Sequence, residues 1–466
     1  MQYISTRGEA EPIGFSDTVM TGLADDGGLF LPSEIPDLRP RFEELAALSY
    51  PDLAFEIIRL YADLPDDVLR ELVNRSYAAF DSPDVVPIRR LNGITMLELF
   101  HGPTLAFKDV ALQFLGNLFE VLLQARGGRL NILTATSGDT GSAAIAGTRG
   151  RESMNAIVLY PHGRVTPVQE LQMTTVLDDN VHNLAIEGDF DDCQTIVKAL
   201  FRDLEFKQSY SLGAMNSINW ARVLAQIVYY VYAALKVMRE RKVDEISFSV
   251  PSGNFGNVFA GYVAWRMGLP IRQLILATNE NDILSRFFNL GDYSRGEVVP
   301  SLSPSMDIQV ASNFERYLYY RVGEDPSRLR GLMEVFGRSG LISGDDLSPK
   351  PPGDPFCAGS ADKDSTIGTI KRVYETFGYV LDPHSAVGVY VGMQKSVPPS
   401  PLICLATAHP AKFDDAVITA LGKCPARHDC IDALQGKPTR RTVLPADENR
   451  VRAYISEHLH PTSKLT

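Results

Sequence analysis

Cysteine, net positive charge and long apolar runs are all scarce in this sequence of 466 residues, and each shortage excludes a class of protein. Its five cysteines are too few, and odd in number, for a disulfide framework. Asp and Glu number 57 against 45 Lys and Arg, so the net charge of −12 argues against binding to nucleic acid or to an anionic membrane. The longest apolar run, Val223–Leu235, is shorter than the about 20 residues that span a bilayer, and it predicts a buried core helix.

The remaining composition is that of a globular protein. Hydrophobic residues make up 45% and charged residues 22% of the sequence, which excludes a disordered chain and allows a large core. The first residues show no basic segment followed by an apolar one, so we expect no secretory signal and predict a soluble, cytoplasmic protein. The sequence does not indicate an oligomeric state.

From residue 91 onward, segments typical of strands alternate with segments typical of helices. This alternation predicts parallel or mixed sheets covered by helices on both faces, which is a three-layer α/β architecture. We predict a mostly helical N-terminal part (1–90), a smaller α/β domain (91–220) and a larger α/β domain (221–466). The stretch between about 325 and 363 is rich in Ser, Gly, Pro and Asp and predicts a surface loop.

Three turns carry the residues of chemical interest, because each follows a predicted parallel strand, and ligands bind at the carboxyl ends of such strands. The first turn, HGPTLAFKD (101–109), places Lys108 at the start of a helix. The helix dipole and burial there both favour the neutral amine, which can act as a nucleophile or a base. A solvated surface lysine is the alternative, although the apolar residues 105–107 before it indicate burial.

The second turn, TATSGDTGSAA (134–144), brings hydroxyl and backbone N–H groups to a helix N-terminus. Such a turn suits a bound carboxylate or phosphate, with Ser137 and Thr140 as side-chain donors. Helix capping by Thr140 or Asp139 would explain the same residues without a ligand.

The third turn, SVPSGNFGNVFAG (249–261), has glycines that let backbone amides approach a ligand closely. The helix that follows supplies partial positive charge for a phosphate. The turn lacks the G-x-G-x-x-G pattern of dinucleotide sites and the G-K-[ST] of nucleotide-triphosphate loops. A glycine-rich turn with an Asn cap is the alternative interpretation.

Four motifs, in this order and spacing, resemble those of the threonine synthase family, in its longer bacterial and fungal branch. They are HGPTLAFKD, TSGDTGSAA, PSGNFGN and LATAHPAKF, and ISTRG and DDGGLF extend the likeness to the start of the chain. The resemblance implies a pyridoxal-phosphate enzyme of fold type II, the tryptophan-synthase-like type. It implies a carbon–oxygen lyase that converts O-phospho-L-homoserine and water to L-threonine and phosphate by γ-elimination and β-addition, the last step of threonine biosynthesis.

The resemblance also implies roles for individual residues. Lys108 would form the Schiff base with pyridoxal 5'-phosphate, Gly253, Asn254, Phe255 and Gly256 would hold the cofactor phosphate, and Thr407 would hydrogen-bond the pyridine nitrogen. A neutral hydroxyl at that nitrogen tunes the ring differently from a carboxylate.

The second turn corresponds, by the same resemblance, to the loop that binds the substrate carboxylate: Ser137, Gly138, Asp139 and Thr140. Many relatives carry Asn where this chain has Asp139, and a carboxylate beside the cofactor's phenolate would repel it unless one is protonated. The role of Asp139 is therefore open. For the substrate phosphate the candidate is Arg164, because a guanidinium matches phosphate geometry, and Ser5, Thr6 and Arg7 are secondary candidates.

Other interpretations differ in what they require. Another pyridoxal-phosphate lyase of this fold, such as a serine or threonine dehydratase or a sulfhydrylase, would share the lysine and the phosphate turn. An inactive ligand-binding relative would not need Lys108, and a dehydrogenase would need the missing dinucleotide motif.

Cys424, His428 and Cys430 match no zinc spacing, so we predict no metal site. The expected partner is the small-molecule substrate, with no nucleic acid and no membrane.

Overall fold

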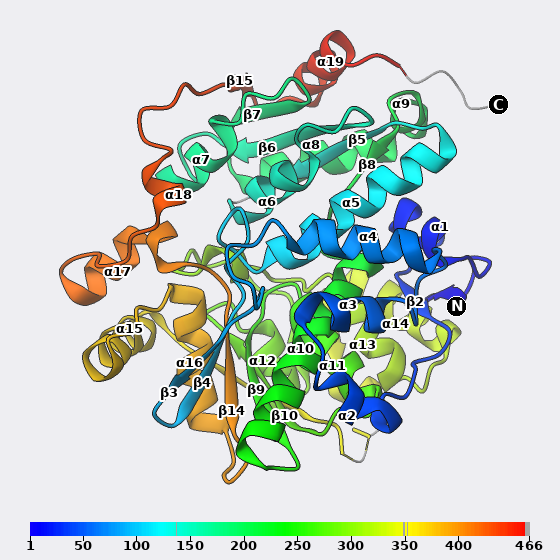
Figure 1. The fold of residues 1–466 in the computed structure, drawn as a ribbon. Coiled ribbons are helices and arrows are strands. Elements are labelled where there is room, and N and C mark those ends of the chain that lie inside the picture. The colour runs from blue at the N-terminus through cyan, green and yellow to red at the C-terminus, as the bar shows by residue number, and fades with distance from the viewer. Residues whose placement is uncertain (137, 348–349, 352, 462–466) are drawn as a thin grey trace. The chain divides into compact units, whose positions relative to one another are not determined.

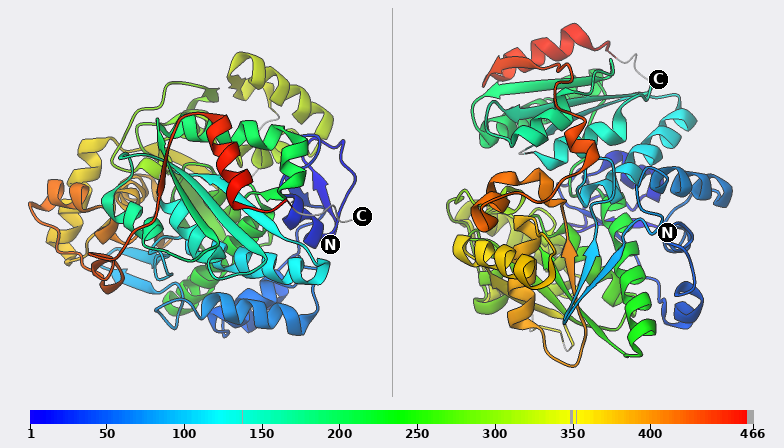
Figure 2. Two further views of the ribbon diagram at one scale, coloured as in Figure 1. Left: turned by 90° about the horizontal axis from the view of Figure 1, so that it is seen from above. Right: turned by 60° about the vertical axis from the view of Figure 1, so that its left-hand side comes forward.

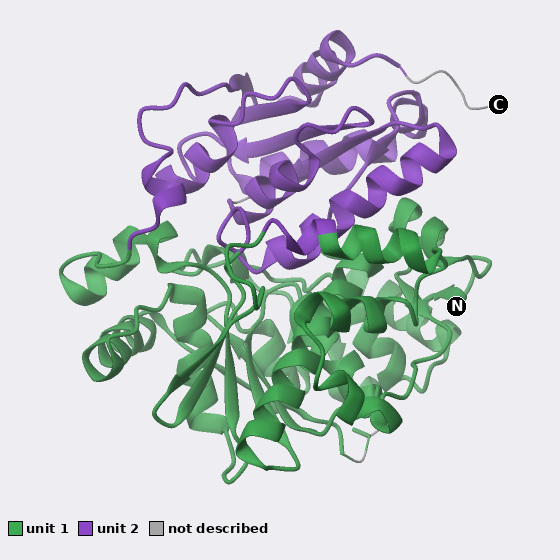
Figure 3. Cartoon of the chain, viewed as in Figure 1, with its two compact units in different colours: residues 1–74, 80–101, 217–426 green, residues 75–79, 102–216, 427–466 purple. Residues whose placement is uncertain are grey.

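The computed structural model describes residues 1–136, 138–347, 350–351 and 353–461, which form two compact units (Figure 3). Unit 1 comprises Met1–Asn74, Phe80–His101 and Ser217–Ala426, and unit 2 comprises Arg75–Ala79, Gly102–Asn216 and Arg427–Thr466. Each unit is therefore assembled from separated stretches of the chain. The division predicted from residue order (1–90, 91–220 and 221–466) stays a prediction.

Unit 1 contains most of the helices and strands (Figure 1). Its strands are β1 (Tyr3–Ser5), β2 (Phe30–Pro32), β3 (Ile88–Leu91), β4 (Ile94–Glu98), β9 (Ile246–Pro251), β10 (Ile271–Thr278), β11 (Asp292–Ser294), β12 (Leu341–Ser343), β13 (Phe356–Ser360) and β14 (Leu402–Ala406). Its α-helices are α1 (Phe15–Thr21), α2 (Phe42–Leu45), α3 (Tyr50–Ile58), α10 (Trp220–Arg241), α11 (Gly256–Arg266), α12 (Ile283–Leu290), α13 (Phe314–Arg321), α14 (Pro326–Ser339), α15 (Lys363–Phe377), α16 (Pro383–Lys395) and α17 (Asp414–Leu421). Short 3₁₀ turns lie at η1 (Arg39–Arg41), η2 (Pro304–Met306), η3 (Gly344–Asp346) and η4 (Pro410–Lys412).

Unit 2 has the strands β5 (Leu130–Ala135), β6 (Met154–Pro161), β7 (Val181–Glu187), β8 (Leu212–Gly213) and β15 (Thr442–Pro445). Its helices are α5 (Lys108–Arg126), α6 (Asp139–Thr148), α7 (Pro167–Thr174), α8 (Phe190–Arg202), α9 (Leu204–Ser209), α18 (Asp429–Asp432) and α19 (Glu448–His458). Helix α4 (Asp66–Tyr77) begins in the first stretch of unit 1 and ends in the first stretch of unit 2.

The central sheet of unit 1 has the strand order β13-β10-β9-β14-β4-β3 and is parallel except for the β3–β4 pair. Helices cover both faces, as two consecutive residues of β9 demonstrate. Phe248 packs edge-on against Tyr230 of α10, whereas the Ser249 hydroxyl donates to the Gly388 carbonyl of α16 at 2.6 Å. Successive side chains of a strand point to opposite faces, so α10 and α16 lie on opposite sides of the sheet.

Helix α10 is the core helix that the apolar run predicts. Within the described residues it alone is long and apolar enough to cross a membrane by length and composition, but 89% of its most apolar window is buried inside the structure. Two of its buried hydroxyls, those of Tyr229 and Tyr230, both donate to Asn257 of α11. The helix therefore packs as protein core.

The sheet of unit 2, in the order β15-β7-β6-β5-β8, is parallel throughout. Alternate residues of β6 enter two separate apolar clusters. Ala156 and Val158 pack with residues of α6 and α7, whereas Ile157 and Leu159 pack with residues of α8 and α19. Figure 2 shows this sheet edge-on, with helices above and below it. Both units thus confirm the predicted three-layer α/β architecture.

One prediction of local structure was wrong. The stretch 325–363, predicted as a surface loop, contains α14 and the strand β13. Phe356, at the start of β13, is buried, and β13 pairs in parallel with β10 as the edge strand of the sheet. Strand β13 was missed because its sequence, FCAGS, has small residues and only one large apolar side chain, and propensity alone gives such a segment no strand signal.

Candidate active site

Lys108 is the first residue of α5 and is buried, with 8% of its surface exposed. The turn before it is held by Asp109, whose carboxylate accepts from the Thr104 backbone N–H (2.8 Å) and hydroxyl (2.7 Å). A Cβ on Gly102 would lie 2.4 Å from the Cβ of Asp109, so this position needs glycine. The lysine is thus fixed at the start of α5, and it is not a solvated surface residue.

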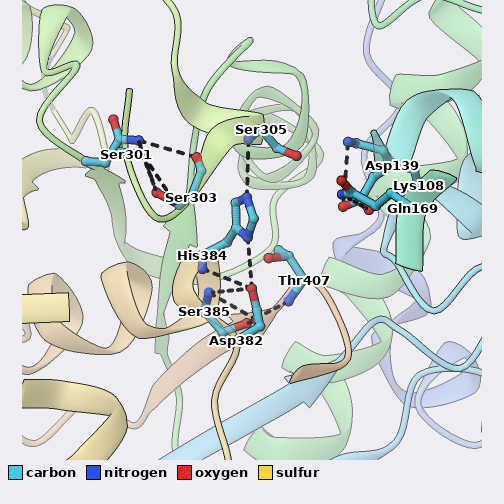
Figure 4. Close-up of polar contacts among 11 residues, drawn as sticks. Lys108, Asp139, Gln169, Ser301, Ser303, Ser305, Asp382, His384, Ser385 and Thr407 are labelled. Atoms are coloured by element: carbon cyan, nitrogen blue, oxygen red, sulfur yellow. Dashed lines mark hydrogen bonds and ion pairs between the residues drawn. The ribbon is translucent and has the colours of Figure 1, made fainter. Parts of the chain in front are cut away.

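Asp139 faces the lysine within unit 2 (Figure 4). One carboxylate oxygen, Oδ2, lies 4.0 Å from Lys108 Nζ, and the other, Oδ1, accepts from Gln169 Nε2 at 2.9 Å. The Gln169 amide oxygen accepts from the Thr166 backbone N–H at the start of α7, which orients the amide so that its NH₂ group points to Asp139. The positive end of α6 stabilises the Asp139 carboxylate.

The turn between β5 and α6 is closed by Thr136 rather than by a capping side chain. Its hydroxyl accepts from the backbone N–H groups of Gly138 and Gly141, each at 2.9 Å. The N-cap of α6 is Gly138, with φ +145°, and it makes no side-chain cap. Capping by Asp139 or Thr140, the alternative explanation, is therefore wrong, because these residues are the first two inside the helix.

The third turn forms a cradle at the N-terminus of α11 in unit 1. Phe255 is its N-cap with φ +63°, and its buried ring packs edge-on against Phe314, which anchors the turn. A Cβ on Gly253 would meet the Ser305 carbonyl oxygen at 2.9 Å and the Met306 Cα at 3.1 Å, so backbone lies directly behind the glycine. An Asn side chain does not cap α11, so that alternative is also wrong.

Asn257, one residue past Gly256, presents a donor that the sequence did not assign. Its Oδ1 accepts from Tyr229 (2.5 Å) and Tyr230 (2.9 Å), whose hydroxyls stay protonated because burial raises the pKa of both phenols well above its usual value. These bonds fix the amide, and its buried Nδ2 has no hydrogen-bond partner among the described residues. An unpaired buried donor costs about 1–3 kcal/mol, which an anion at the helix N-terminus would recover.

Thr407 follows β14 and is buried, with 5% of its surface exposed. Its backbone N–H donates to Ser385 Oγ at 3.0 Å, whereas its own hydroxyl has no hydrogen-bond partner in the described part of the chain. A hydroxyl held in this way can donate to, or accept from, a ligand atom.

The structure places the predicted residues in two groups, one in each unit. Unit 2 holds Lys108, Gly138, Asp139, Thr140 and Arg164, and unit 1 holds Gly253, Asn254, Phe255, Gly256 and Thr407. Lys108 and Asp139 are brought together, while Arg164 is exposed in the turn after β6. Ser137 lies outside the described residues. The secondary candidates Thr6 and Arg7 both bind Glu315, and Ser5 binds Asp26.

Pyridoxal phosphate fits the residues that are present. The Thr407 hydroxyl and the Asn257 amide are buried polar groups with unused bonding capacity, and the Gly253 turn leaves backbone N–H groups at a helix N-terminus. The lysine that such a cofactor requires is buried and faces a carboxylate. Among the described residues there is no cluster of three or more His, Cys, Asp or Glu side chains that could hold a metal ion.

Comparison with known proteins first defines the class. Residues 85–328 match the family model of pyridoxal-phosphate dependent enzymes, and this range includes Lys108 and the glycine cradle. The parallel α/β architecture described above is that of fold type II in this class. The cofactor and the fold type predicted from the sequence are confirmed.

The flanking segments and the relatives then identify the family. Residues 2–77 match the model "Threonine synthase N terminus", and residues 385–455 match "Threonine synthase, C-terminal". The chain is 47% identical to a threonine synthase of Schizosaccharomyces pombe, over 90% of this chain and 89% of that one, and 46% identical to one of Pseudomonas aeruginosa, over 98% of each. The crystal structure of a PLP-bound threonine synthase from Brucella melitensis superposes with a TM-score of 0.94 at 46% identity, covering 98% of this chain and 99% of that one. The chain belongs to the threonine synthase family, which confirms the predicted carbon–oxygen lyase activity.

The Asn257 amide provides the first test of the cradle. Asn257→Asp keeps the oxygen that accepts from the two tyrosines but replaces the donor by an oxygen that repels phosphate. We expect the dissociation constant for pyridoxal phosphate to rise about tenfold or more, measured by absorbance titration of the cofactor-free protein. Asn289→Asp, at an exposed position of α12, is the control. An unchanged dissociation constant in the Asn257 variant would remove this residue from the cradle.

Proposed function

We propose that the protein uses pyridoxal phosphate to convert O-phospho-L-homoserine and water to L-threonine and phosphate. The observation that carries the proposal is Lys108, a buried amine at a helix start that faces the Asp139 carboxylate. Membership in the threonine synthase family supports the choice of substrate. When bound, the cofactor supplies an aldehyde for amine capture and an electron-withdrawing ring that acidifies the adjacent carbon of the substrate.

Lys108 is the residue that moves protons. With pyridoxal phosphate bound, its Nζ would be the base that removes the α-proton of the substrate and would then transfer protons at the neighbouring carbons. Asp139 Oδ2, 4.0 Å away, stabilises the ammonium form of Nζ after each removal. Gln169 keeps that carboxylate in place by donating to its other oxygen. This gives Asp139 the role that the resemblance left open: it is the counter-ion of the catalytic lysine.

The other residues bind and orient. The cradle Gly253–Gly256, with the Asn257 amide, holds the cofactor phosphate through backbone N–H groups and the positive end of α11. The Thr407 hydroxyl bonds the ring nitrogen without adding charge. In unit 2, the α6 start with Ser137, Gly138 and Thr140 binds the substrate carboxylate, and Arg164 binds the phosphate that leaves.

The cellular setting is proposed on composition. The substrate is a small anion, and the net charge of −12 disfavours nucleic acid and anionic membranes as partners. We place the enzyme in the cytoplasm.

Replacement of Lys108 tests the whole proposal. Lys108→Ala should lose the visible absorption band of the bound cofactor and all measurable phosphate release from O-phosphohomoserine. Borohydride reduction of the wild-type protein, followed by peptide mapping, should tag Lys108. Lys198→Ala, on the exposed face of α8 in the same unit, should retain both properties. If reduction tags a different lysine, the assignment is wrong.

The counter-ion role of Asp139 predicts a graded pair of variants. Asp139→Asn removes the charge and should lower kcat about 100-fold, whereas Gln169→Leu only loosens the carboxylate and should lower kcat about tenfold. The Michaelis constant should change little in both, since neither change removes a group that binds the substrate uniformly. Gln194→Leu, on α8, serves as the control. Steady-state phosphate release measures all four proteins, and a Gln169 variant with wild-type kcat would contradict the role.

Arg164 is tested by separating binding from chemistry. Arg164→Ala should raise the Michaelis constant for O-phosphohomoserine at least about tenfold while leaving cofactor affinity unchanged, because the guanidinium contacts the substrate phosphate alone. Phosphate release at varied substrate concentration gives the first value and absorbance titration the second. An unchanged Michaelis constant would exclude Arg164 from the site.

A further inference from the structure

The start of α16 holds a buried polar cluster that the catalytic scheme above does not use (Figure 4). Asp382 is the N-cap of the helix, and His384 and Ser385 are its second and third residues. All three are at most 4% exposed. We name Asp382, His384 and Ser385 the α16 cap.

The Asp382 carboxylate is the centre of the cap. Its Oδ1 accepts from the His384 backbone N–H and from His384 Nδ1, each at 2.9 Å, and its Oδ2 accepts from the Ser385 hydroxyl. The serine hydroxyl donates to the carboxylate and not to the imidazole, so the three residues do not form the relay of a hydrolase triad. A buried carboxylate needs several donors, and here they are all supplied by the first turn of one helix.

One arm of the cap reaches Thr407. Ser385 Oγ accepts from the Thr407 backbone N–H at 3.0 Å. The Ser385 hydroxyl also donates to Asp382, which fixes the orientation of this hydroxyl. The Thr407 backbone is fixed in turn, and it carries the side-chain hydroxyl that has no partner among the described residues. The position of the group assigned to the cofactor ring therefore depends on Ser385.

The other arm reaches the back of the phosphate cradle. His384 Nε2 accepts from the Ser305 backbone N–H at 3.3 Å, which requires a lone pair on Nε2 and places the ring proton on Nδ1, facing Asp382. The carbonyl oxygen of Ser305 is the nearest atom to a Cβ built on Gly253. The η2 turn that His384 holds is thus the wall against which the cradle glycine packs.

The residues that flank the η2 turn are held by a separate set of hydrogen bonds. Asn279, buried at the end of β10, donates to Ser301 (2.7 Å), Ser303 (3.0 Å) and Asp307 (2.7 Å), on both sides of η2. With these residues fixed, the contact from His384 to Ser305 sets how far η2 advances toward Gly253.

We propose that the α16 cap is a positioning device that fixes Gly253 and Thr407 relative to each other, and so matches the phosphate cradle to the ring-nitrogen group. The inference rests on the proposed roles of those two residues. The cap touches neither substrate nor cofactor; it acts through the η2 turn and through the Thr407 backbone. Because both arms meet at one carboxylate, disturbance of one arm is transmitted to the other.

The test uses the holoenzyme and four variants. Ser385→Ala removes the acceptor of the Thr407 N–H, and should shift the absorption maximum of the bound cofactor and lower kcat at least fivefold, about the effect of one lost hydrogen bond. His384→Leu removes the support of η2 and should raise the cofactor dissociation constant at least about fivefold, while His384→Gln, which retains an acceptor for Ser305, should restore most of the affinity. In the double variant Ser385→Ala/His384→Leu, the losses of kcat and of cofactor affinity should be smaller than the product of the losses in the two single variants, because both residues bond to Asp382.

Ser365→Ala is the matched control. Ser365 is the third residue of α15, and both its N–H (2.8 Å) and its side chain hydrogen-bond the N-cap Asp362, as those of Ser385 do with Asp382. The Thr407 N–H is bonded by Ser385. Loss of capping alone would affect Ser365→Ala and Ser385→Ala equally, and only stability. Wild-type spectrum and cofactor affinity in folded Ser385→Ala and His384→Leu would overturn the proposal.

Two further outcomes are decisive. If His384→Leu does not fold, Ser385→Ala decides: a wild-type spectrum and a wild-type kcat in that variant count against the cap. If the wild-type enzyme itself releases no phosphate from O-phosphohomoserine, the proposed function fails, whereas the cap is still judged by cofactor affinity and absorbance.

Discussion

Buried polar groups at the carboxyl edge of a parallel sheet must be paired, and in unit 1 the Asp382 carboxylate is one centre of this pairing. It accepts hydrogen bonds from His384 and Ser385 in the first turn of α16. His384 in turn bonds the turn behind Gly253, and Ser385 bonds the backbone of Thr407. Thr407 Oγ1 and Asn257 Nδ2 are buried and have no hydrogen-bond partner among the described residues. Fixed polar groups with unused bonding capacity are preorganised for a ligand, because binding then requires little rearrangement.

The same logic holds in unit 2 on a smaller scale. Thr136 closes the turn before α6 through backbone N–H groups, so the side chain of Asp139 is released from capping. Gln169 then takes one carboxylate oxygen and leaves the other facing Lys108. An amide is suited to this task because it donates without carrying charge, and the attraction between lysine and carboxylate is left intact. Asp139 thus lies between an amide donor and the lysine.

Motifs and periodicity predicted the alternating strands and helices and the core helix α10, whereas the roles of the residues in the three turns stay a prediction. They could not predict β13, whose small residues give no strand signal until β10 is present beside it. Asn257 stood in a recognised motif, but its role depends on Tyr229 and Tyr230, which a different helix supplies. Asp382–Ser385 has the D-P start of a capped helix, a local signal that was available. Its link to Thr407 depends on the pairing of β14 and could not be read locally.

The position of β14 has a consequence for biosynthesis of the chain. Strand β14 lies between β9 and β4, so the early hairpin β3–β4 joins the sheet only after residues 402–406 have been made. A ribosome releases the N-terminal strands first, and their open edges must wait for this late partner. Thr407 arrives directly behind it. In the growing chain, the Thr407 backbone can therefore be fixed by Ser385 only at this late stage.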